Sequence, residues 1–365
     1  MTQEYIIFGT GSVGRKLLEY FNRYFPHIKI AYFLDNNINK NVNGYTVKHP
    51  SNLVLNRNQK ILIASSYAEE IIVQLEKMNY QQNLHFYDAR SLPGLLARYE
   101  KFLLNKNKLD ENKIKYNFID INRLKTKKTS DRLFILGTGG TINDITDEQW
   151  GHIKKYDSWG MNYWSLHSFV PTYYTFEFFY KTENLDNLIK LNRLLNIDYD
   201  FIKELGNMED NSISILKSEN KIIPFLQNHY LDFYSKKDFE QRFDLLKELN
   251  LIEDDNCFYS FVSTAVTIFS IAIRLGYKEI IFCGVELKNN GYFYDDYDDV
   301  NEYFIPRSDK KQLTHETFCD QSENLGADQM IFLLYEKFNE SKELKLYTAT
   351  TKSALYPKLP LYNWE

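Results

Sequence analysis

Two glycine-rich turns, each directly after a short apolar segment, are the residues of this chain best suited to binding a phosphate. Gly9, Gly11 and Gly14 form a GxGxxG pattern after the apolar run 5–8, and a second turn, 137–141, follows another apolar run. Glycine lets the main chain approach a phosphate closely, and a helix that begins after such a turn offers unpaired N–H groups. Both turns therefore predict nucleotide-binding chemistry.

The first turn carries a further signal and leaves two interpretations open. Asp35 lies 21 residues beyond Gly14, where a ribose-binding acid is expected in a dinucleotide-binding fold. On the first interpretation Gly9, Gly11, Gly14 and Asp35 bind a nucleotide, and the chain is an NAD-dependent sugar-nucleotide oxidoreductase or epimerase. On the second, this unit keeps the tight turn without binding a dinucleotide, because no Tyr-x-x-x-Lys pair follows it, and it serves as a ligand-sensing or docking module.

The segments around these turns alternate between strand and helix. After the first turn, apolar runs at 28–34 and 60–64 predict strands, and 69–78 predicts a helix. After the second turn the pattern returns, with predicted strands at 132–136, 157–162, 173–177 and 279–283 and a nearly all-apolar helix at 263–275. This alternation predicts an α/β fold with two Rossmann-like domains, each built on a parallel sheet.

The composition along the chain predicts where these domains begin and end. We expect a small Rossmann-like domain at 1–92, a helical and basic linker at 93–129, and a second, larger domain at 130–365. The charged and helix-rich stretch at about 181–256 is too long for one loop, so it predicts a helical lid inserted into the second domain.

Composition also limits the partners and the compartment. The 44 basic and 49 acidic residues give a net charge of -5, which argues against nucleic acid as a partner. Three cysteines without a CxxC pair suit a reducing compartment, and neither a signal peptide nor a long apolar run is present, so we expect a cytoplasmic protein. The lysine-rich linker leaves open a peripheral contact with the inner membrane or a purely solvated surface. Homo-oligomerisation is also open.

Five segments of the second domain, in the same order and with similar spacing, resemble the bacterial sialyltransferases of glycosyltransferase family 42. These segments are 135–143, 160–164, 273–286, 290–294 and 344–347, followed by Ser353. The resemblance covers residues 131–365, and its strongest piece is the Leu-Gly-Tyr-Lys-Glu-Ile run at 275–280 with the glycine that follows at 284.

The resemblance implies a transferase that takes a nonulosonic acid from a CMP-sugar donor. Sialic acid, legionaminic acid, pseudaminic acid and Kdo all fit this description, and the acceptor would be a surface glycan or glycolipid of capsule, lipooligosaccharide or O-antigen. Carried over from the family, the residues that bind the donor nucleotide would be Gly137, Thr138, Gly139, Thr141, Asn162, Glu177 and Thr264. Glu177 stands where the family has an asparagine.

The catalytic groups that the resemblance implies are a base and two partners of the departing phosphate. Tyr294 matches one of two family tyrosines at that phosphate, and Lys288 stands at the position of the other. Lys288 can serve the same role, because an ammonium group is a good partner for a phosphate. His315 is the first choice for the base that takes the acceptor proton, although a strict count along the segment reaches Ser322. The alternative is that His315 is a surface or structural histidine, and Glu177, Glu286 and Glu316 are then next in line for the base. Phe261 replaces a family arginine.

A run of acids at 295–299 raises the question of a metal. Clustered carboxylates bind Mg²⁺ or Mn²⁺ in other glycosyltransferases that use sugar diphosphates. The resembling family needs no metal, because CMP leaves as a monophosphate. We therefore expect no metal site and no cofactor besides the donor substrate. The family implies inversion at the sugar carbon, but the replaced residues leave retention open.

Overall fold

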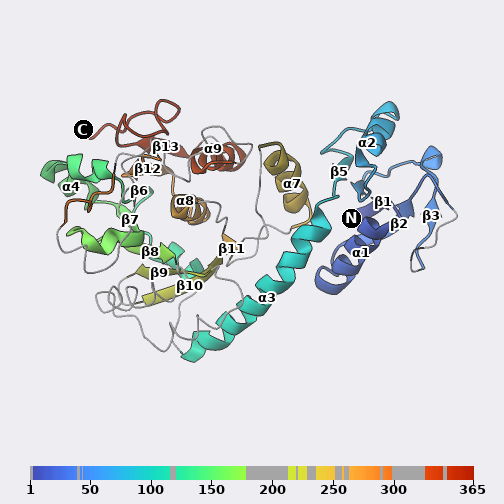
Figure 1. Cartoon of the computed structure of the whole chain (residues 1–365), viewed down its shortest axis with the longest axis horizontal. Helices are drawn as coiled ribbons and strands as arrows, with labels where there is room; N and C mark the ends of the chain where they lie inside the picture. Colours follow the sequence, from blue (N-terminus) through green and yellow to red (C-terminus); the bar gives the residue numbers. More distant parts are fainter. Residues whose placement is uncertain are drawn as a thin grey trace. The chain divides into compact units, whose positions relative to one another are not determined.

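The chain forms two compact units, which are described separately here. The structure, a computed structural model, describes residues 3–38, 42, 44–115, 121–177, 213–218, 221–227, 236–250, 257–258, 263–287, 291–297, 325–339 and 343–365 (Figure 1). The N-terminal unit consists of Met1–Glu100 and Ser235–Asp254, and the C-terminal unit of Lys101–Tyr234 and Asp255–Glu365.

The N-terminal unit is built on a five-stranded parallel sheet with the order β3-β2-β1-β4-β5. Its strands are β1 (Glu4–Phe8), β2 (Lys29–Leu34), β3 (Val47–Lys48), β4 (Gln59–Ile63) and β5 (Phe86–Asp88). The central strand β1 is apolar and buried from Tyr5 to Phe8, as expected for a parallel strand covered on both faces. The strand order reverses direction between β1 and β4, which creates a crevice at the carboxyl ends of these two strands.

Helices cover this sheet through narrow apolar faces. They are α1 (Ser12–Tyr24), α2 (Ala68–Lys77) and the first part of α3 (Leu92–Lys115), which belongs to this unit up to Glu100. A short 3-10 turn lies at Pro50–Asn52. In α1, Leu17, Leu18 and Phe21 recur at helical spacing and are fully buried. The helix ends before Pro26, which cannot continue it.

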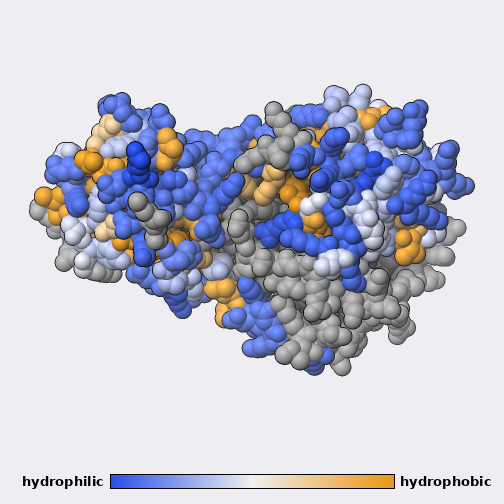
Figure 2. Space-filling model, turned by 180° about the vertical axis from the view of Figure 1, so that it is seen from behind, coloured by the Kyte–Doolittle hydropathy of each residue, from blue (hydrophilic) through white to orange (hydrophobic). Residues whose placement is uncertain are grey.

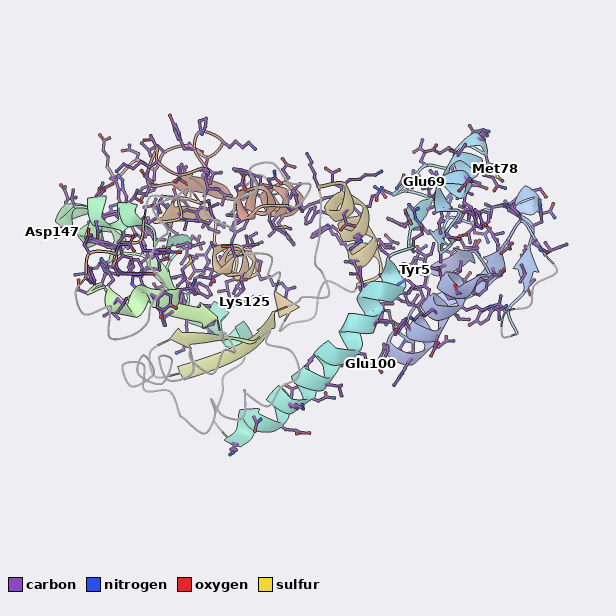
Figure 3. All side chains as sticks on the ribbon, in the orientation of Figure 1. Tyr5, Glu69, Met78, Glu100, Lys125 and Asp147 are labelled. Atoms are coloured by element: carbon purple, nitrogen blue, oxygen red, sulfur yellow. The ribbon has the colours of Figure 1, made fainter. Side chains whose placement is uncertain are left out.

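Helix α7 (Lys236–Glu248) also belongs to the N-terminal unit, although it lies more than 120 residues further along the chain. Phe239, Phe243 and Leu246 are buried along it, and the carboxylate of Glu248 is 2.7 Å from Lys60 Nζ on β4. The phenol groups of Tyr5 and Tyr87 donate to the same carboxylate. Tyr5 is labelled in Figure 3.

This grouping differs from the sequence interpretation of 181–256 as one helical insertion. The described part of that stretch is divided, because α7 packs in the N-terminal unit while two strands, β9 (Ile213–Ser218) and β10 (Lys221–Gln227), extend the sheet of the C-terminal unit. The expectation that the stretch is helix-rich missed this hairpin. Its alternation is interrupted by charged residues and by Pro224, which weakens a strand signal.

The C-terminal unit repeats the strand order of the first. Its parallel strands are β6 (Arg132–Leu136), β7 (Asp157–Met161), β8 (Tyr173–Glu177), β12 (Glu279–Cys283) and β13 (Lys345–Thr348). They follow the order β8-β7-β6-β12-β13, and β9, β10 and β11 (Cys257–Phe258) continue beyond β8. The direction of the order reverses between β6 and β12. The expected α/β fold with two Rossmann-like parallel sheets is thus confirmed.

The described part of the C-terminal unit contains the helices α4 (Asp147–Ile153), α8 (Thr264–Arg274) and α9 (Ala327–Phe338). It also contains 3-10 turns at Ile121–Thr126, Gly140–Asp144 and Asn162–Leu166. Helix α8 is apolar on nearly all sides and buried from Thr264 to Ala272, as its sequence predicts. Helix α4 begins with a capping box between Thr146 and Gln149.

The surface of the described residues is mainly polar on the face shown in Figure 2, where apolar side chains occur in small separate groups. Across the described ranges, no helix combines the length and the apolar character needed to span a membrane.

Candidate functional site

The first candidate site lies in the C-terminal unit, where β6 and β12 end side by side. The turn after β6 is fixed to the loop after β12 by main-chain hydrogen bonds from Gly137 N to Cys283 O, at 2.7 Å, and from Gly139 N to Gly284 O, at 2.9 Å. Ligands of open α/β sheets bind at such a reversal of strand order, outside the carboxyl ends of the strands. The site expected from the second glycine turn therefore lies at the position that the topology favours.

The glycines of this turn are required by close packing. A Cβ atom on Gly137 would lie 2.2 Å from the carbonyl oxygen of Gly284, and one on Gly139 would lie 1.3 Å from Oε2 of Glu286. The carbonyl of Thr138 accepts from the N–H of Phe293 at 3.0 Å. The loop after β12 and residues 291–297 thus hold the turn closely, and the turn is a framework element.

Glu286 is a buried carboxyl group at the centre of this framework. Its side chain is only 4% exposed, and the hydroxyl of Thr141 donates to Oε1. Burial raises the pKa of Glu286, and the hydrogen bond from Thr141 opposes this shift. A carboxyl group with a raised pKa at a strand end is suited to proton transfer or to holding the turn in place. The sequence analysis gave Glu286 only as a substitute for His315 in the role of base, and it did not predict the packing of this carboxyl group against the glycine turn.

Asn162 and Thr264 come together at the end of β7, from positions 102 residues apart. Thr264 Oγ1 lies 3.3 Å from Asn162 Oδ1, as a donor to the amide oxygen. Asn162 has a left-handed backbone with φ of 51°, and its carbonyl accepts from the hydroxyl of Tyr174. Non-glycine residues in this conformation are uncommon and cluster at functional positions.

The amino end of α8 begins at this pair, because Thr264 is its first residue. Ser263 caps the helix by accepting from Ala265 N at 3.2 Å, and the first turn of α8 contains no acidic residue. A helix amino end of this kind favours negative charge. Asn162, Thr264 and α8 therefore form one polar group that can meet a nucleotide.

Tyr294 lies in an aromatic cluster next to that polar group. Its ring is stacked on Tyr292 with centroids 5.1 Å apart and meets the edge of Tyr163, which directly follows Asn162, at 5.7 Å. Tyr294 is 1% exposed, and burial raises the pKa of its phenol well above the usual range. The phenol is therefore a neutral hydrogen-bond donor at physiological pH.

Several residues expected at the site fall outside the described ranges or are described only in part. His315, Lys288 and Phe261 lie outside the described residues. Glu177 is the last residue of β8, where it pairs with Ser214 of β9, and its backbone position is all that is described. These assignments stay predictions.

The acidic run 295–299 is described for its first three residues. Asp295 accepts from the N–H of Tyr292 at 2.8 Å, which gives it a place in the local turn. Among the described residues no group of three or more His, Cys, Asp or Glu side chains is arranged to hold a metal ion.

Two other histidines near β7 lie among aromatic rings. His152 Nε2 is 2.9 Å from the hydroxyl of Tyr362, and His167 is stacked on Trp164 with centroids 4.7 Å apart. Burial lowers the pKa of both imidazoles, so they are neutral groups of the aromatic core.

The second candidate site lies in the N-terminal unit, at the reversal between β1 and β4. Gly9 has φ of 124°, and a Cβ atom there would lie 2.5 Å from Ala64 O. A Cβ atom on Gly14 would lie 2.0 Å from Gly9 O, so this glycine lets α1 pack on the turn. A Cβ atom on Gly11 would meet no atom within 4 Å. The three glycines thus have the turn, approach and packing roles of a dinucleotide-binding loop.

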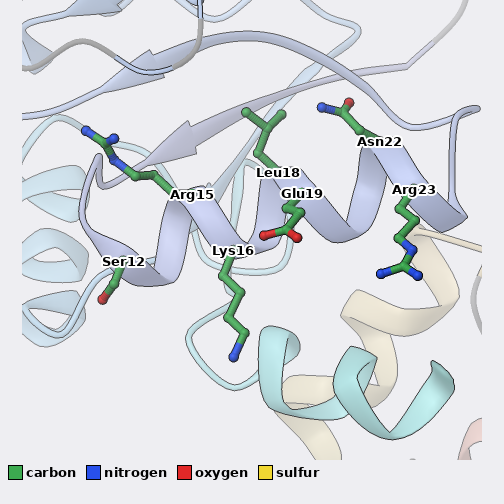
Figure 4. Close-up of a pocket in the computed structure, with 7 residues that line it drawn as sticks. All are labelled: Ser12, Arg15, Lys16, Leu18, Glu19, Asn22 and Arg23. Atoms are coloured by element: carbon green, nitrogen blue, oxygen red, sulfur yellow. The ribbon is translucent and has the colours of Figure 1, made fainter. Parts of the chain in front are cut away.

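Asp35 is bound to this glycine loop. Its Oδ2 accepts from the N–H and the hydroxyl of Thr10, at 2.9 and 2.5 Å, and its Oδ1 accepts from Asn37 N at 2.8 Å. Arg15 Nε donates to Thr10 O at 3.0 Å, and Figure 4 shows Arg15 on the first turns of α1 with its guanidinium directed toward the start of the helix. The four residues expected from the GxGxxG pattern therefore lie at one place.

A cavity of about 490 Å³ opens between the glycine loop and the segment after β4. It is lined by the turn residues Gly9, Gly11, Ser12 and Val13, by Asp35, Asn36 and Asn37, and by Ala64, Ser65, Ser66, Tyr67, Glu70 and neighbouring apolar atoms. Its volume lies in the range of small-molecule sites.

Comparisons of this chain with models of known protein families, with curated proteins and with solved structures gave no significant match.

Proposed function

We propose that the C-terminal unit is a glycosyltransferase that moves a nonulosonic acid from a CMP-sugar donor to a surface glycan. The observation that carries the proposal is the contact between Thr264 and Asn162 at the end of β7, beside the glycine turn of β6. The family resemblance selected these residues from separate segments, and a shared nucleotide site requires them to lie together. The proposal includes a sialyltransferase-like arrangement with a lid drawn from residues 181–234, the part of the expected insertion that belongs to the C-terminal unit.

In this proposal the donor nucleotide binds outside the carboxyl ends of β6 and β7. Because the Thr264 hydroxyl donates to Asn162 Oδ1, this pair would offer the Asn162 amide N–H groups as donors and the Thr264 oxygen as an acceptor to the cytosine and ribose. The amino end of α8 faces the negative charge of the phosphate. The packed turn 137–141 gives this surface its shape.

The reaction breaks the bond between C2 of the sugar and the phosphate oxygen. An acceptor hydroxyl oxygen forms the new bond to C2, and the electron pair of the broken bond leaves with CMP. The acceptor proton passes to a base, for which His315 is the proposed residue. Tyr294 and Lys288 are proposed to stabilise the charge that develops on the departing phosphate. The leaving group is a monophosphate, so no metal is required in this scheme.

The proposed setting is the cytoplasm, with an acceptor carried by a lipid at the inner membrane. Lysines of the segment 93–129 would attract the anionic headgroups at that surface. Co-sedimentation with vesicles that contain or lack anionic lipid tests this part of the proposal.

The direct test is release of CMP from CMP-activated sialic acid, legionaminic acid, pseudaminic acid and Kdo, with a glycan acceptor present. We expect turnover with one of these donors. Replacing Asn162 with Gly removes the amide but keeps the left-handed backbone, so we expect binding of CMP to weaken about tenfold while the fold is retained. Thr264→Val should have a similar effect.

A matched control is available at Asn79, which also has a left-handed backbone, with φ of 64°, but lies on the surface of the N-terminal unit. Asn79→Gly should leave CMP binding and turnover unchanged. Absence of CMP release from all four donors, or equal effects of the two Asn→Gly changes, would remove the proposal.

A further inference from the structure

The cavity of the N-terminal unit is a second, separate candidate for a ligand site, and it does not depend on the proposed transferase. It lies at the reversal of strand order between β1 and β4, where open α/β sheets bind ligands. Its 490 Å³ volume is enough for a nucleotide-sized molecule.

The wall formed by the glycine loop is open where a phosphate would lie. Gly9 and Gly14 are closed in by their neighbours, but the space beside Gly11 contains no atom within 4 Å of the Cβ position. Gly11 is also the N-cap residue of α1, and as a glycine it has no side chain to cap the helix. The first turn of α1 contains no acidic residue. The first turn of α1 therefore places no carboxylate against a diphosphate, and the two acids that line the cavity, Asp35 and Glu70, come from other segments.

The opposite wall carries groups suited to a ribose. The Asp35 carboxylate is half-buried, lines the cavity and is held in position by Thr10 and Asn37. Oδ2 already accepts both hydrogen bonds from Thr10, so a ribose hydroxyl would donate to Oδ1, beside the N–H of Asn37. Its negative charge would repel a phosphate on the 2′ position.

An aromatic side chain stands at the mouth of the cavity. Tyr67 lines it, is 68% exposed, and caps α2 without a side-chain hydrogen bond of its own to that helix. Its N–H donates to Ser65 Oγ at 3.2 Å, which holds the segment after β4. The loop after β2 is tied to α2 by a reciprocal amide pair between Asn36 and Gln74, at 3.2 and 3.3 Å. An exposed ring at this position can stack on a nucleobase.

We propose that this cavity binds a ribonucleoside diphosphate group with free 2′ and 3′ hydroxyls, with the diphosphate at Gly11, the ribose at Asp35 and the base against Tyr67. NAD, ADP and UDP share this chemistry and differ in the base and in the attached group.

The test is isothermal titration of the full chain with NAD, ADP, UDP and NADP. We expect at least one of the first three to bind at one site, and NADP to bind at least about tenfold more weakly than NAD. Binding of NAD and ADP would assign an adenine nucleotide, and binding of UDP alone a uridine nucleotide, and either supports the site. Failure of all three to bind at about 1 mM, or NADP binding as tightly as NAD, would overturn it.

Two variants connect binding to the cavity. Gly11→Ala places a methyl group into the open space at an allowed φ of -71°, so the unit should fold and nucleotide affinity should fall about tenfold or more. Gly94→Ala is the matched control, because a Cβ atom there also meets nothing within 4 Å, on α3. Tyr67→Ala should weaken binding about fivefold or more, and Tyr67→Phe should retain it, because stacking needs the ring alone.

Titration of CMP separates this inference from the proposed transferase. Gly11→Ala should leave CMP affinity unchanged, whereas Asn162→Gly should leave affinity for the diphosphate unchanged. Undiminished binding of the diphosphate to Gly11→Ala would place it elsewhere and end the inference, whatever the result for CMP.

Discussion

The two glycine turns stand at equivalent places in two sheets with the same strand order, yet their middle glycines have opposite surroundings. The space beside Gly11 in the N-terminal unit is open, whereas the Cβ position of Gly139 in the C-terminal unit coincides with the carboxylate of Glu286. The first turn leads directly into the 13-residue helix α1, and the second into a 3-10 turn, Gly140–Asp144. One sequence pattern therefore produces an exposed main chain in one unit and a packed framework in the other.

The loop after the neighbouring strand accounts for the difference. After β12 the chain passes through Gly284 and Leu287, which both have left-handed backbones, and this brings Glu286 against the turn. After β4 the chain continues through Ser65 to α2 and leaves a cavity. In the proposed transferase, ligand recognition would consequently use side chains such as Asn162 and Thr264, whereas in the N-terminal unit the main chain at Gly11 is itself accessible.

The largest effect should come from exchanging the middle glycines for alanine. Gly139→Ala forces the buried Glu286 carboxylate to move, and we expect a loss of about 1–3 kcal/mol or more in the free energy of unfolding. Gly11→Ala should change it by less than about 1 kcal/mol. Urea unfolding of the two variants measures both values, and equal losses would contradict the difference between the turns.

The next largest loss of stability should come from a substitution on α7, and its location shows which unit α7 stabilises. Glu248→Ala removes the carboxylate that lies 2.7 Å from Lys60 Nζ and that accepts from the phenols of Tyr5 and Tyr87. The side chains of Lys60 and Glu248 are 22% and 21% exposed. We expect a loss of about 1–2 kcal/mol, confined to the unfolding of the N-terminal unit. Hydrogen exchange of β1 and β4 against β6 and β12 locates the loss.

Glu343→Ala is the control for that change. Glu343 is 67% exposed and 4.0 Å from Lys278, so its removal should cost less than about 0.5 kcal/mol. A loss after Glu248→Ala that appears in β6 and β12 instead would show that α7 stabilises the other unit.

The sequence predicted the local part of this architecture and missed the part that depends on distant contacts. Strands such as β1, β6 and β12 are short apolar runs that end at glycine, and both signals are local. The position of α7 depends on Glu248 reaching Lys60, 188 residues away in the sequence, and no periodicity encodes that pairing. The β9–β10 hairpin was missed for its weak alternation.

The candidate sites show the same division. The glycine pattern and spacing to Asp35 predicted one site because they lie within a single βαβ unit. Only the family resemblance suggested that Asn162 and Thr264 belong to one site. Glu286 packs against Gly139, which lies 147 residues earlier in the chain, and no local pattern indicates that contact. His315 and Lys288 stay predictions.

A pH dependence should distinguish the buried acid of the second turn. The folded-state pKa of Glu286 is raised by burial, so its contribution to stability is fully present below about pH 4.3, the ordinary value, and is lost as pH rises through the folded pKa. Glu286→Gln keeps an acceptor for Thr141 without the charge. We expect it to be more stable than the wild type at pH 8, by up to about 1 kcal/mol, with the difference shrinking toward pH 4.

Thermal unfolding across that pH range measures this difference. Glu343→Gln is a suitable comparison, because Glu343 is a 67% exposed acid and the same chemical change is made there. A stability gain of Glu286→Gln that does not vary with pH would show that the Glu286 carboxyl is not destabilised by its burial.

The smallest expected change in stability is also the sharpest test of the open turn. Gly11 is the N-cap residue of α1, and its extended backbone, with φ of -71° and ψ of -169°, also suits aspartate. Gly11→Asp should therefore increase the free energy of unfolding of the N-terminal unit by about 0.3 kcal/mol. The same carboxylate would occupy the phosphate position and repel the ligand. Thermal unfolding with and without ADP or UDP should then show a slightly more stable protein whose melting temperature no longer rises when nucleotide is added.

The two outcomes have different meanings for Gly11. Aspartate is a better N-cap than glycine, so Gly11 does not give α1 its greatest stability. Loss of the nucleotide response in Gly11→Asp would indicate that phosphate binding requires the glycine. A variant that still responds would mean that the open space beside Gly11 is unrelated to phosphate binding, and the two turns would then differ in packing only.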